Sequence, residues 1–453
     1  MKFTNPFRAP DLSHIPGPRG LRFISHMFHY QRDSLGALER AYREYGPVVS
    51  YPWPISTIIL YDLKTIKKIL IDKDQIYGKG TQTDQMKAVL GEGLVTNSDR
   101  PSWLRNRTVV SREMSSRAIK AYAPIMEEFS KNACEILPDM SDVLVTEFLR
   151  KLTFRIAGRV LLGANLTDED SEAVDSAVLF TARMAHDHMF QLLPVPYWIP
   201  VPKNREFHRH LGNLDRVVYK IIREAKSLAV TEQMSIAARL VKSRHPETGE
   251  ALDDKTLRDE VTTLLIAGYE TTSYSVSWIL GLLAHHPEEQ QAIQLEGESE
   301  LPLESMEFSR THPRLYRAIL EGMRLYTAIP MSSRRCFGSD QYLGYPVPPG
   351  TSVVIPVWVI HRHKNFWDDP ETFRPSRFEN LDTSNIDQYI PFSKGARRCV
   401  GEPFSLVEIG IIVREVLRNF TLTPKEKKLP EPLAHVSLKP RTPLLLNFQR
   451  RQA

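Results

Sequence analysis

The longest apolar stretch of the chain, Val261 to Leu283, constrains the fold more than any other feature. It is nearly long enough to cross a bilayer as a helix, but it contains Glu270 and several hydroxyl side chains. An acidic side chain inside a bilayer is costly and rare. We therefore expect this stretch to form a long helix that is buried inside a soluble protein.

The composition supports a large packed body. The chain has 453 residues, of which 42% are hydrophobic and 25% are charged, as in ordinary globular proteins. No linker, repeat or low-complexity tract divides it, so we expect one domain over residues 1–453, with residues 1–20 as a proline-rich lead-in. The three cysteines, Cys134, Cys336 and Cys399, are far apart and form no CxxC pair, which argues against a disulfide framework and a zinc site.

The charge and the N-terminal residues limit the expected partners. The net charge of +5 is small for this length and no long basic run occurs, so nucleic acid is not an expected partner. The first residues lack the apolar run of a signal peptide or a membrane anchor. We expect a cytoplasmic protein with no integral membrane anchor.

The pattern of apolar residues predicts a mainly α protein with a minor β region. Leu35–Tyr45 has helical spacing and Val48–Tyr61 is rich in strand-forming residues, which predicts a helix followed by a hairpin. Helical signals dominate from Pro101 to His286, and strand signals return at Thr351–Ile360 and at His435–Phe448. We expect a long central helix and small sheets near the N-terminal and C-terminal parts.

An unusually apolar loop is expected at Leu192–Pro202, because its four prolines exclude a regular helix. It is either a connector folded onto the core or a lid over an apolar cavity.

Cys399 stands in a distinctive loop, Pro391 to Gly401. A lone cysteine is more often an inert buried residue than a ligand. Glycines on both sides, however, let backbone amides approach a thiolate, and nearby arginines favour its negative charge. The pattern Phe-x-x-Gly-x-Arg-x-Cys-x-Gly resembles the haem-binding loop of the cytochrome P450 family. It is filled here by Phe392, Gly395, Arg397, Cys399 and Gly401.

The resemblance implies the cytochrome P450 fold and haem b as the cofactor, with Cys399 as the iron ligand. Backbone amides near Gly395 and Gly401 are then expected to donate hydrogen bonds to the sulfur, and Phe392 to shield it from water. Haem propionates suit guanidinium groups. The arginines that match the family are Arg397, Arg107 in a Trp-x-x-x-Arg pair with Trp103, and Arg334, for which Arg335 is the competing candidate.

The segment Ala267-Gly268-Tyr269-Glu270-Thr271 resembles the part of the family's long helix that crosses the distal haem face. The resemblance implies that Ala267 and Gly268 make room for oxygen, and that Glu270 and Thr271 are catalytic residues that deliver protons. Leu264, Gly268, Thr271 and Ser275 share one helical face, on which Gly268 is expected to open a notch. The alternative is that Thr271 only bonds a carbonyl one turn back and that Glu270 pairs with a cation.

Glu321 and Arg324, three residues apart on an expected helix, resemble the family's Glu-x-x-Arg pair. With the later Arg377 they are expected to form a buried ion network that supports the cysteine loop. Ser376 departs from the family pattern, which commonly has glutamate at this position.

These motifs together imply a haem-thiolate monooxygenase that inserts one oxygen atom from O2 into a lipophilic small molecule. The expected pocket residues are Leu264, Ala267, Ile329, Met331 and Val436. Electrons are expected from an external ferredoxin-type, flavodoxin-type or diflavin reductase, for which Lys394, Arg398 and Arg112 offer basic side chains.

Two other functions stay open at this stage. One is a haem-thiolate enzyme that uses peroxide or isomerises its substrate. The other is a non-catalytic haem sensor or carrier. The pair Glu270 and Thr271 argues against both.

Overall fold

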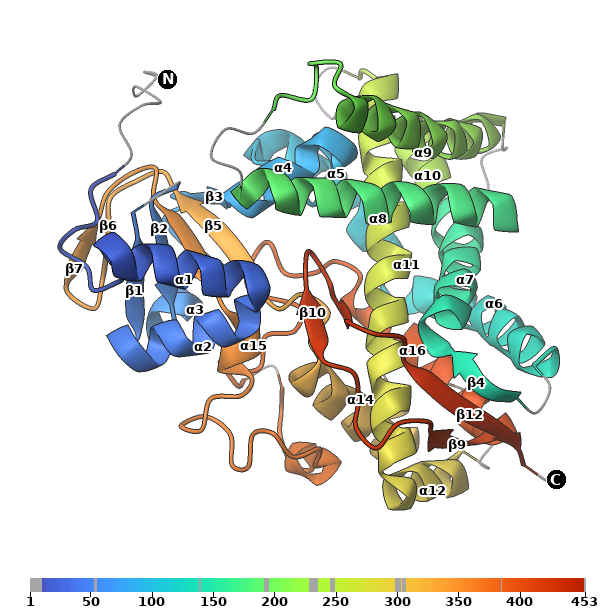
Figure 1. Cartoon of the computed structure of the whole chain (residues 1–453). Coiled ribbons are helices and arrows are strands. Elements are labelled where there is room, and N and C mark those ends of the chain that lie inside the picture. The colour runs from blue at the N-terminus through green and yellow to red at the C-terminus, as the bar shows by residue number, and fades with distance from the viewer. Residues whose placement is uncertain are drawn as a thin grey trace.

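The computed structural model describes residues 10–451 except 53–54, 138–139, 191–194, 228–234, 245–248, 298–302, 304–306 and 384. It shows a mainly helical protein with small sheets, which confirms the predicted fold class (Figure 1). The helices are α1 (Gly20–Arg32), α2 (Ser34–Tyr45), α3 (Leu63–Ile71), α4 (Thr81–Leu90), α5 (Arg100–Glu113), α6 (Ser116–Glu135), α7 (Val145–Ala157) with the π-helical turn η1 (Gly158–Leu162), α8 (Asp168–Phe190), α9 (Pro202–Ser227), α10 (Ile236–Lys242), α11 (Asp254–His285), α12 (Pro287–Glu296), α13 (Phe308–Thr311), α14 (Pro313–Leu325), α15 (Val357–Ile360), the 3-10 turn η2 (Pro375–Phe378) and α16 (Glu402–Asn419).

The long central helix predicted from Val261–Leu283 is α11. Asp253 begins it by accepting a hydrogen bond from the amide of Thr256. Most of its side chains are buried, because α7, α9, α14 and α16 pack around it (Figure 1). Among the described residues, no helix has the length and apolarity needed to cross a membrane.

The predicted helix and hairpin near the N-terminus are confirmed as α2 followed by antiparallel strands β1 (Val48–Tyr51) and β2 (Thr57–Leu60). This hairpin joins three later strands in one five-stranded sheet of order β1-β2-β8-β5-β3. The added strands are β3 (Tyr77–Lys79), β5 (Ser332–Cys336) and β8 (Ser352–Ile355). The strand expected over Thr351–Ile360 ends at Ile355, because Pro356 has no amide to continue the ladder and α15 follows.

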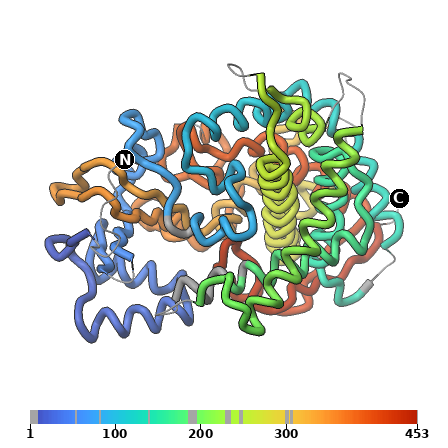
Figure 2. Tube along the Cα trace, turned by 90° about the horizontal axis from the view of Figure 1, so that it is seen from above, coloured from blue at the N-terminus to red at the C-terminus, as the bar shows by residue number. Residues whose placement is uncertain are grey.

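The remaining strands form three small sheets: β6 (Asp340–Tyr342) with β7 (Tyr345–Val347), β10 (Pro432–Ala434) with β11 (Leu438–Pro440), and the sheet β4 (Met140–Leu144), β12 (Leu445–Arg450) and β9 (Phe420–Pro424). Figure 1 shows α1–α3 and the five-stranded sheet on one side of α11 and the helices α6 and α7 on the other, and Figure 2 shows the blue N-terminal segments and the yellow α11 from above. The turn between β10 and β11 reaches α11, where Ser437 bonds Glu270. The middle of α11 therefore lies between the two halves of the molecule.

Gln290 ties α12 to β9 beside the end of α11. Its buried amide nitrogen donates to the carbonyl oxygens of Leu283 (3.2 Å) and Leu422 (3.0 Å), and its oxygen accepts from the amide of Leu422 (2.7 Å). Each buried backbone group that loses its partner costs about 1–3 kcal/mol.

We predict that Gln290→Ala lowers the free energy of unfolding by about 2–3 kcal/mol, because it leaves buried groups of Leu422 without partners. Urea unfolding followed by far-UV circular dichroism measures the change. Gln291→Ala, at an exposed position of the same helix, is the matched control and should shift the unfolding free energy by less than about 0.5 kcal/mol. Equal changes in the unfolding free energy of the two variants would show that the hydrogen bonds of Gln290 do not stabilise the protein.

Candidate functional site

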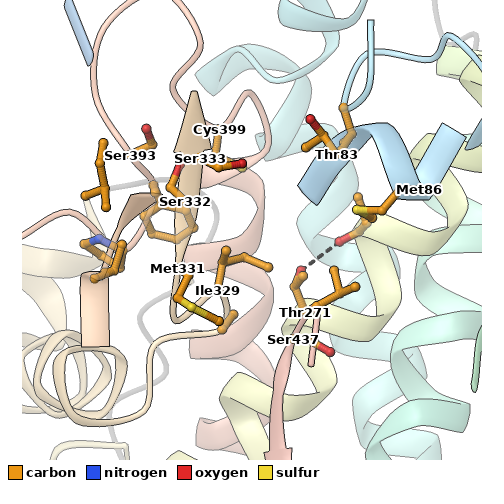
Figure 3. A pocket seen from close by; sticks show the side chains of 18 of the residues that line it. Thr83, Met86, Thr271, Ile329, Met331, Ser332, Ser333, Ser393, Cys399 and Ser437 are labelled. Atoms are coloured by element: carbon orange, nitrogen blue, oxygen red, sulfur yellow. Dashed lines mark hydrogen bonds between the residues drawn. The ribbon is translucent and has the colours of Figure 1, made fainter. Parts of the chain in front are cut away.

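A cavity of about 390 Å³ lies between the middle of α11, helix α4, strand β5, the Cys399 loop and the turn after β10. Thr271 and Met86 border it on the side of α11 and α4, and Ile329 and Met331 lie opposite (Figure 3). The cavity brings together most of the residues singled out in the sequence, namely Ala267, Glu270, Thr271, Ile329, Met331, Arg334, Phe392, Arg397, Cys399 and Val436.

The Cys399 loop is a tight turn whose sulfur faces the cavity. The amide of Cys399 donates to the carbonyl of Phe392 (2.9 Å), which closes the turn. Removal from bulk water raises the pKa of the Cys399 thiol, while a hydrogen bond from the backbone of Gly401 and the charges of Arg107 and Arg398 lower it. The sulfur therefore has the surroundings of a thiolate that needs a further positive partner, such as a metal.

Gly395 has a structural task that the sequence reasoning did not identify. It adopts a φ of +74°, and a Cβ atom there would lie 2.0 Å from the carbonyl oxygen of Leu70 at the end of α3. The glycine thus lets the loop pass directly over this helix. Among the contacts described for the sulfur, the backbone hydrogen bond comes from Gly401 and not from Gly395.

Three cationic side chains line the cavity near the sulfur: Arg334, Arg397 and Lys79. Burial, followed by the charge of Arg397, lowers the pKa of Arg334 to about 10. The pKa of Lys79 is well below its ordinary value because of desolvation and the charges of Arg334 and Arg397. No ion pair between described residues engages any of the three cations. Asp72 lies near enough to favour the charges of the two arginines.

The structure supports Arg334 over Arg335, since Arg334 is buried at the cavity and Arg335 reaches Asp84 (3.6 Å) instead. Lys79 was missed in the sequence. The register of β3 against β5 sets Lys79 opposite Arg334. Its only local signal is a lysine between two glycines in a short strand, Gly78-Lys79-Gly80.

Trp103 and Arg107 do not line the cavity, but Trp103 contacts Arg397, which does. The Arg397 guanidinium lies 4.5 Å from the centre of the Trp103 ring, and that of Arg107 lies 5.2 Å from it. Arg397 also donates to the carbonyl of Asn97 (3.0 Å), and Arg107 donates to the carbonyl of Arg398 (2.7 Å). The indole therefore holds both guanidinium groups at the edge of the Cys399 loop.

These residues fit haem b. Buried cations without partners are costly, and two carboxylates at the rim of a planar ligand would supply the missing charge to Arg334, Arg397 and Lys79. A thiolate at Cys399 would supply the axial ligand on the same wall of the cavity.

Glu270 and Thr271 lie together on the α11 wall. The Thr271 hydroxyl donates to the carbonyl of Ala267 (2.7 Å, dashed in Figure 3). Glu270 accepts a hydrogen bond from the Ser437 hydroxyl (3.1 Å). Desolvation raises the pKa of Glu270, whereas the Ser437 hydrogen bond and the more distant charge of Arg150 lower it. The Thr271 bond one turn back is compatible with both the catalytic and the structural interpretation.

Two expectations for α11 are wrong. Leu264 was expected in the pocket, but it is buried in the hydrophobic core, while Thr263 and Ile266 line the cavity. Gly268 was expected to open a notch toward the cavity. Instead it faces α7 and η1, where a Cβ atom would lie 2.8 Å from Leu161. Thr271 and Ser275 of the expected face do line the cavity, whereas the packing of α7 and η1 against α11 covers Gly268.

The apolar loop at Leu192–Pro202 lies partly outside the described residues. The described part, 195–202, does not line the cavity. Its carbonyls at Pro196 and Ile199 accept hydrogen bonds from the Asn204 side chain (2.8 Å each), which fixes it to the start of α9. Trp198 is 80% exposed. This part of the loop is a connector and not a lid.

Comparison with known proteins assigns the chain to a family. Residues 15–448 match the family model described as Cytochrome P450. The chain belongs to the cytochrome P450 family. Membership supports haem b as the cofactor.

Relatives of this P450 come from several kingdoms. The bifunctional cytochrome P450/NADPH–P450 reductase 2 of Bacillus subtilis is 27% identical over 97% of the chain, which spans 44% of that protein. The chloroplastic protein LUTEIN DEFICIENT 5 of Arabidopsis thaliana is 27% identical over 81% of the chain, which spans 65% of it. Cyclooctat-9-en-7-ol 5-monooxygenase of Streptomyces melanosporofaciens is 26% identical over 79% of the chain and 78% of its own length. The chain thus spans less than two thirds of the first two relatives.

Behind the cysteine loop, the P450 chain has a buried ion network. Arg324 donates to both carboxylate oxygens of Glu321 (2.7 and 2.9 Å), and Arg377 donates to one of them (2.8 Å). The side chains of Glu321 and Arg324 are 0% exposed. The amide of Arg374 also donates to Glu321 (2.9 Å). The network forms with Ser376 at the position where the family commonly has glutamate.

His361 connects this network to the cysteine loop and was also missed in the sequence. Arg324 donates to the carbonyl of His361 (2.7 Å), and the His361 ring contacts the carbonyl of Arg324 (3.2 Å) and the amide of Ile390 (3.0 Å). Burial and the charges of Arg324 and Arg362 lower the pKa of His361 to about 3. The ring is therefore neutral, so that Nδ1–H donates to Arg324 and Nε2 accepts from Ile390, next to Pro391.

The basic side chains expected to meet a redox partner are partly engaged within the chain. Lys394 pairs with Asp387 (3.2 Å) and Arg398 with Glu402, while Arg112 is exposed. Arg112 is consequently the strongest of the three candidates.

We predict that Arg377→Met lowers the free energy of unfolding by about 3 kcal/mol or more, because it leaves a buried carboxylate of Glu321 with one cation fewer. The matched control is Arg374→Met, which removes a solvent-exposed side chain three residues earlier and keeps the backbone bond to Glu321. Guanidinium unfolding of the haem-loaded protein measures both. If the two variants unfold at the same concentration, the network does not support the loop.

We also predict that Lys79→Met speeds the loss of haem to apomyoglobin about tenfold, because one charge-assisted hydrogen bond to a propionate is lost. The control is Lys73→Met, which changes an exposed lysine near the same sheet. Haem transfer is followed in the Soret region. An unchanged transfer rate would contradict a propionate contact of Lys79.

Proposed function

We propose that this P450 inserts one oxygen atom from O2 into a lipophilic small molecule, with electrons from a separate redox protein. The observation that carries the proposal is one cavity that joins the Cys399 sulfur to Glu270 and Thr271 through a largely apolar lining. Ala267, Ile329, Met331 and Val436 contribute to this lining, as a lipophilic substrate requires.

When bound, haem would supply the chemistry of oxygen activation, which a thiolate ligand favours. The residues of the chain have other tasks. Cys399 supplies the thiolate, and Gly401 limits its charge by donating a backbone hydrogen bond. Arg334, Arg397 and Lys79 orient the cofactor through its carboxylates. The apolar side chains exclude water and hold the substrate.

Glu270 and Thr271 are proposed to supply protons on the opposite wall. Because desolvation raises the pKa of Glu270, its carboxyl group keeps a proton at higher pH than an exposed glutamic acid does. Ser437 holds one carboxylate oxygen at 3.1 Å. The Thr271 hydroxyl is directed along α11 to Ala267 (2.7 Å) and can present its lone pairs to the cavity.

The electron donor is proposed to be a ferredoxin-type, flavodoxin-type or diflavin reductase. The name of the Bacillus subtilis relative pairs a P450 with an NADPH–P450 reductase in one protein, which supports a partner of this kind. A cytoplasmic location without an integral anchor and a single domain over the whole chain remain predictions.

The decisive experiment feeds the haem-loaded protein with NADPH and surrogate reductases under ¹⁸O2, together with lipophilic compounds that shift its Soret band. The proposal expects products that carry one labelled oxygen atom. A peroxide-dependent enzyme would give product only with hydrogen peroxide. A sensor would bind ligands and give no product under either condition, and each of these results would overturn the proposal.

We predict that Thr271→Ala lowers the fraction of electrons recovered in product at least about tenfold, because proton delivery to the cavity is impaired. Ser275→Ala, one turn further along the same helix, is the matched control. NADPH consumption and product are measured in the same reaction. Equal coupling in the two variants would favour the structural interpretation of Thr271.

A further inference from the structure

The loop between α4 and α5 is held against the start of α11 by two neighbouring carboxylates. We propose that Asp259 and Glu260 are positioning residues that latch the loop Gly91–Val95 onto α11, and so set how readily large ligands enter and leave the cavity. The inference rests on the proposed function only in treating this cavity as the substrate site.

The bonds of the latch are made to the backbone of the loop. Glu260 is fully buried, and its Oε2 accepts from the amide of Leu94 (3.1 Å). The Oδ2 of Asp259 accepts from the amide of Glu92 (2.9 Å). The second oxygen of Glu260 accepts from the side-chain nitrogen of Asn106 on α5 (2.7 Å). Asp259 and Glu260, in one turn of α11, therefore bind the loop through the amides of Glu92 and Leu94. They also bind the following helix, α5, through Asn106.

Arg258 adds a hydrogen bond to the end of α4. It donates to the carbonyl of Val89 and to the Asp215 carboxylate on α9 (2.8 Å). Three consecutive residues of α11, 258 to 260, thus supply hydrogen bonds to residues 89, 92 and 94. Leu94 is itself buried, so its amide depends on the Glu260 carboxylate and not on water for a hydrogen-bond partner.

Two glycines allow the loop to lie directly on the helix. Gly91 has a φ of +56°, and a Cβ atom there would lie 2.0 Å from the Asp259 carboxylate. At Gly93 a Cβ atom would lie 2.1 Å from the Thr263 hydroxyl and 2.5 Å from the Asp259 carbonyl oxygen. Any other side chain at Gly93 would push the loop away from α11 without changing a charge.

The latch sits at the wall of the cavity. Leu90, which precedes the loop, and Val95, its last residue, line the cavity. On α11, Thr263 and Ile266 line it one turn after the latch. Release of residues 91–94 would therefore part the loop from α11 at the point where both form the wall.

The stability of the latch also depends on pH through Glu260. Burial and the charge of Asp259 raise the pKa of Glu260 to about 7, against the bonds from Asn106 and Leu94 and the charge of Arg105, which lower it. The other charged groups around it are Arg258 and Lys255 on α11 and Asp215 on α9. An exposed glutamic acid has a pKa near about 4.3. When the loop is released from α11, the Glu260 carboxyl group therefore binds its proton less tightly. Rising pH consequently favours release of the loop.

The test uses the haem-loaded protein and two readouts. Hydrogen exchange by mass spectrometry over residues 88–97 should be about tenfold faster in Glu260→Ala than in the wild type, because the amide of Leu94 loses its acceptor. Dissociation of a bulky azole, clotrimazole, followed in the Soret region, should also be about tenfold faster, while carbon monoxide binding stays within about twofold.

The controls separate a gate from a general loss of stability. Asp254→Asn changes an exposed acid in the first turn of the same helix and should leave both readouts unchanged. Gly93→Ala should speed clotrimazole release with both carboxylates intact. Clotrimazole release from the wild type should accelerate as the pH rises from about 5 to about 7 and level off above that, and Glu260→Gln should flatten this dependence.

Several results would overturn the proposal. One is unchanged exchange in Glu260→Ala. Another is the same pH profile in Glu260→Gln as in the wild type. If Glu260→Ala does not fold, Gly93→Ala and Glu260→Gln decide the question alone. Loss of the thiolate-type carbon monoxide spectrum in the wild-type protein would instead refute the proposed function and leave the exchange result to stand by itself.

Discussion

One electrostatic problem underlies the whole site, because the Cys399 thiol and three cations line the same cavity. Desolvation lowers the pKa values of Arg334, Arg397 and Lys79, and the charge of Arg397 lowers those of Arg334 and Lys79 further. No ion pair between described residues neutralises the three cations. Such a cluster is stable only with an anionic partner. Bound haem b would offer two carboxylates to the cations and an iron to Cys399, so that one cofactor would satisfy both halves of the site.

The protein around this cavity is built to hold those groups still. On one side, Glu321 and Arg324 fix the carbonyl of His361, and the His361 ring holds Ile390 at the entrance to the cysteine loop. On the other side, α11 supplies Glu270 and Thr271 and, near its start, the carboxylates that hold the α4–α5 loop. The same helix thus bears both the proposed proton donors and the latch at the wall of the cavity.

The sequence predicted features whose determinants are local. The buried helix followed from its apolar run, and the cysteine loop followed from its glycines and arginines. It did not predict Lys79, which reaches Arg334 only through the register of β3 and β5, or His361, whose partners are 29 and 37 residues away. Leu264 and Gly268 were misplaced because the rotation of a fully buried helix is set by its neighbours and not by its own pattern. The roles of the site residues stay predictions.

The central claim is that Cys399, as a thiolate, and the cations around it hold haem b in this cavity. The measurement that tests it most directly is the absorption spectrum of the freshly purified, reduced and carbon monoxide-bound protein, compared with that of Cys399→His. The wild type should show the band typical of thiolate-ligated haem, and the variant should show a band typical of histidine-ligated haem. A histidine-type band in the native wild-type protein would show that Cys399 does not bind the iron as a thiolate.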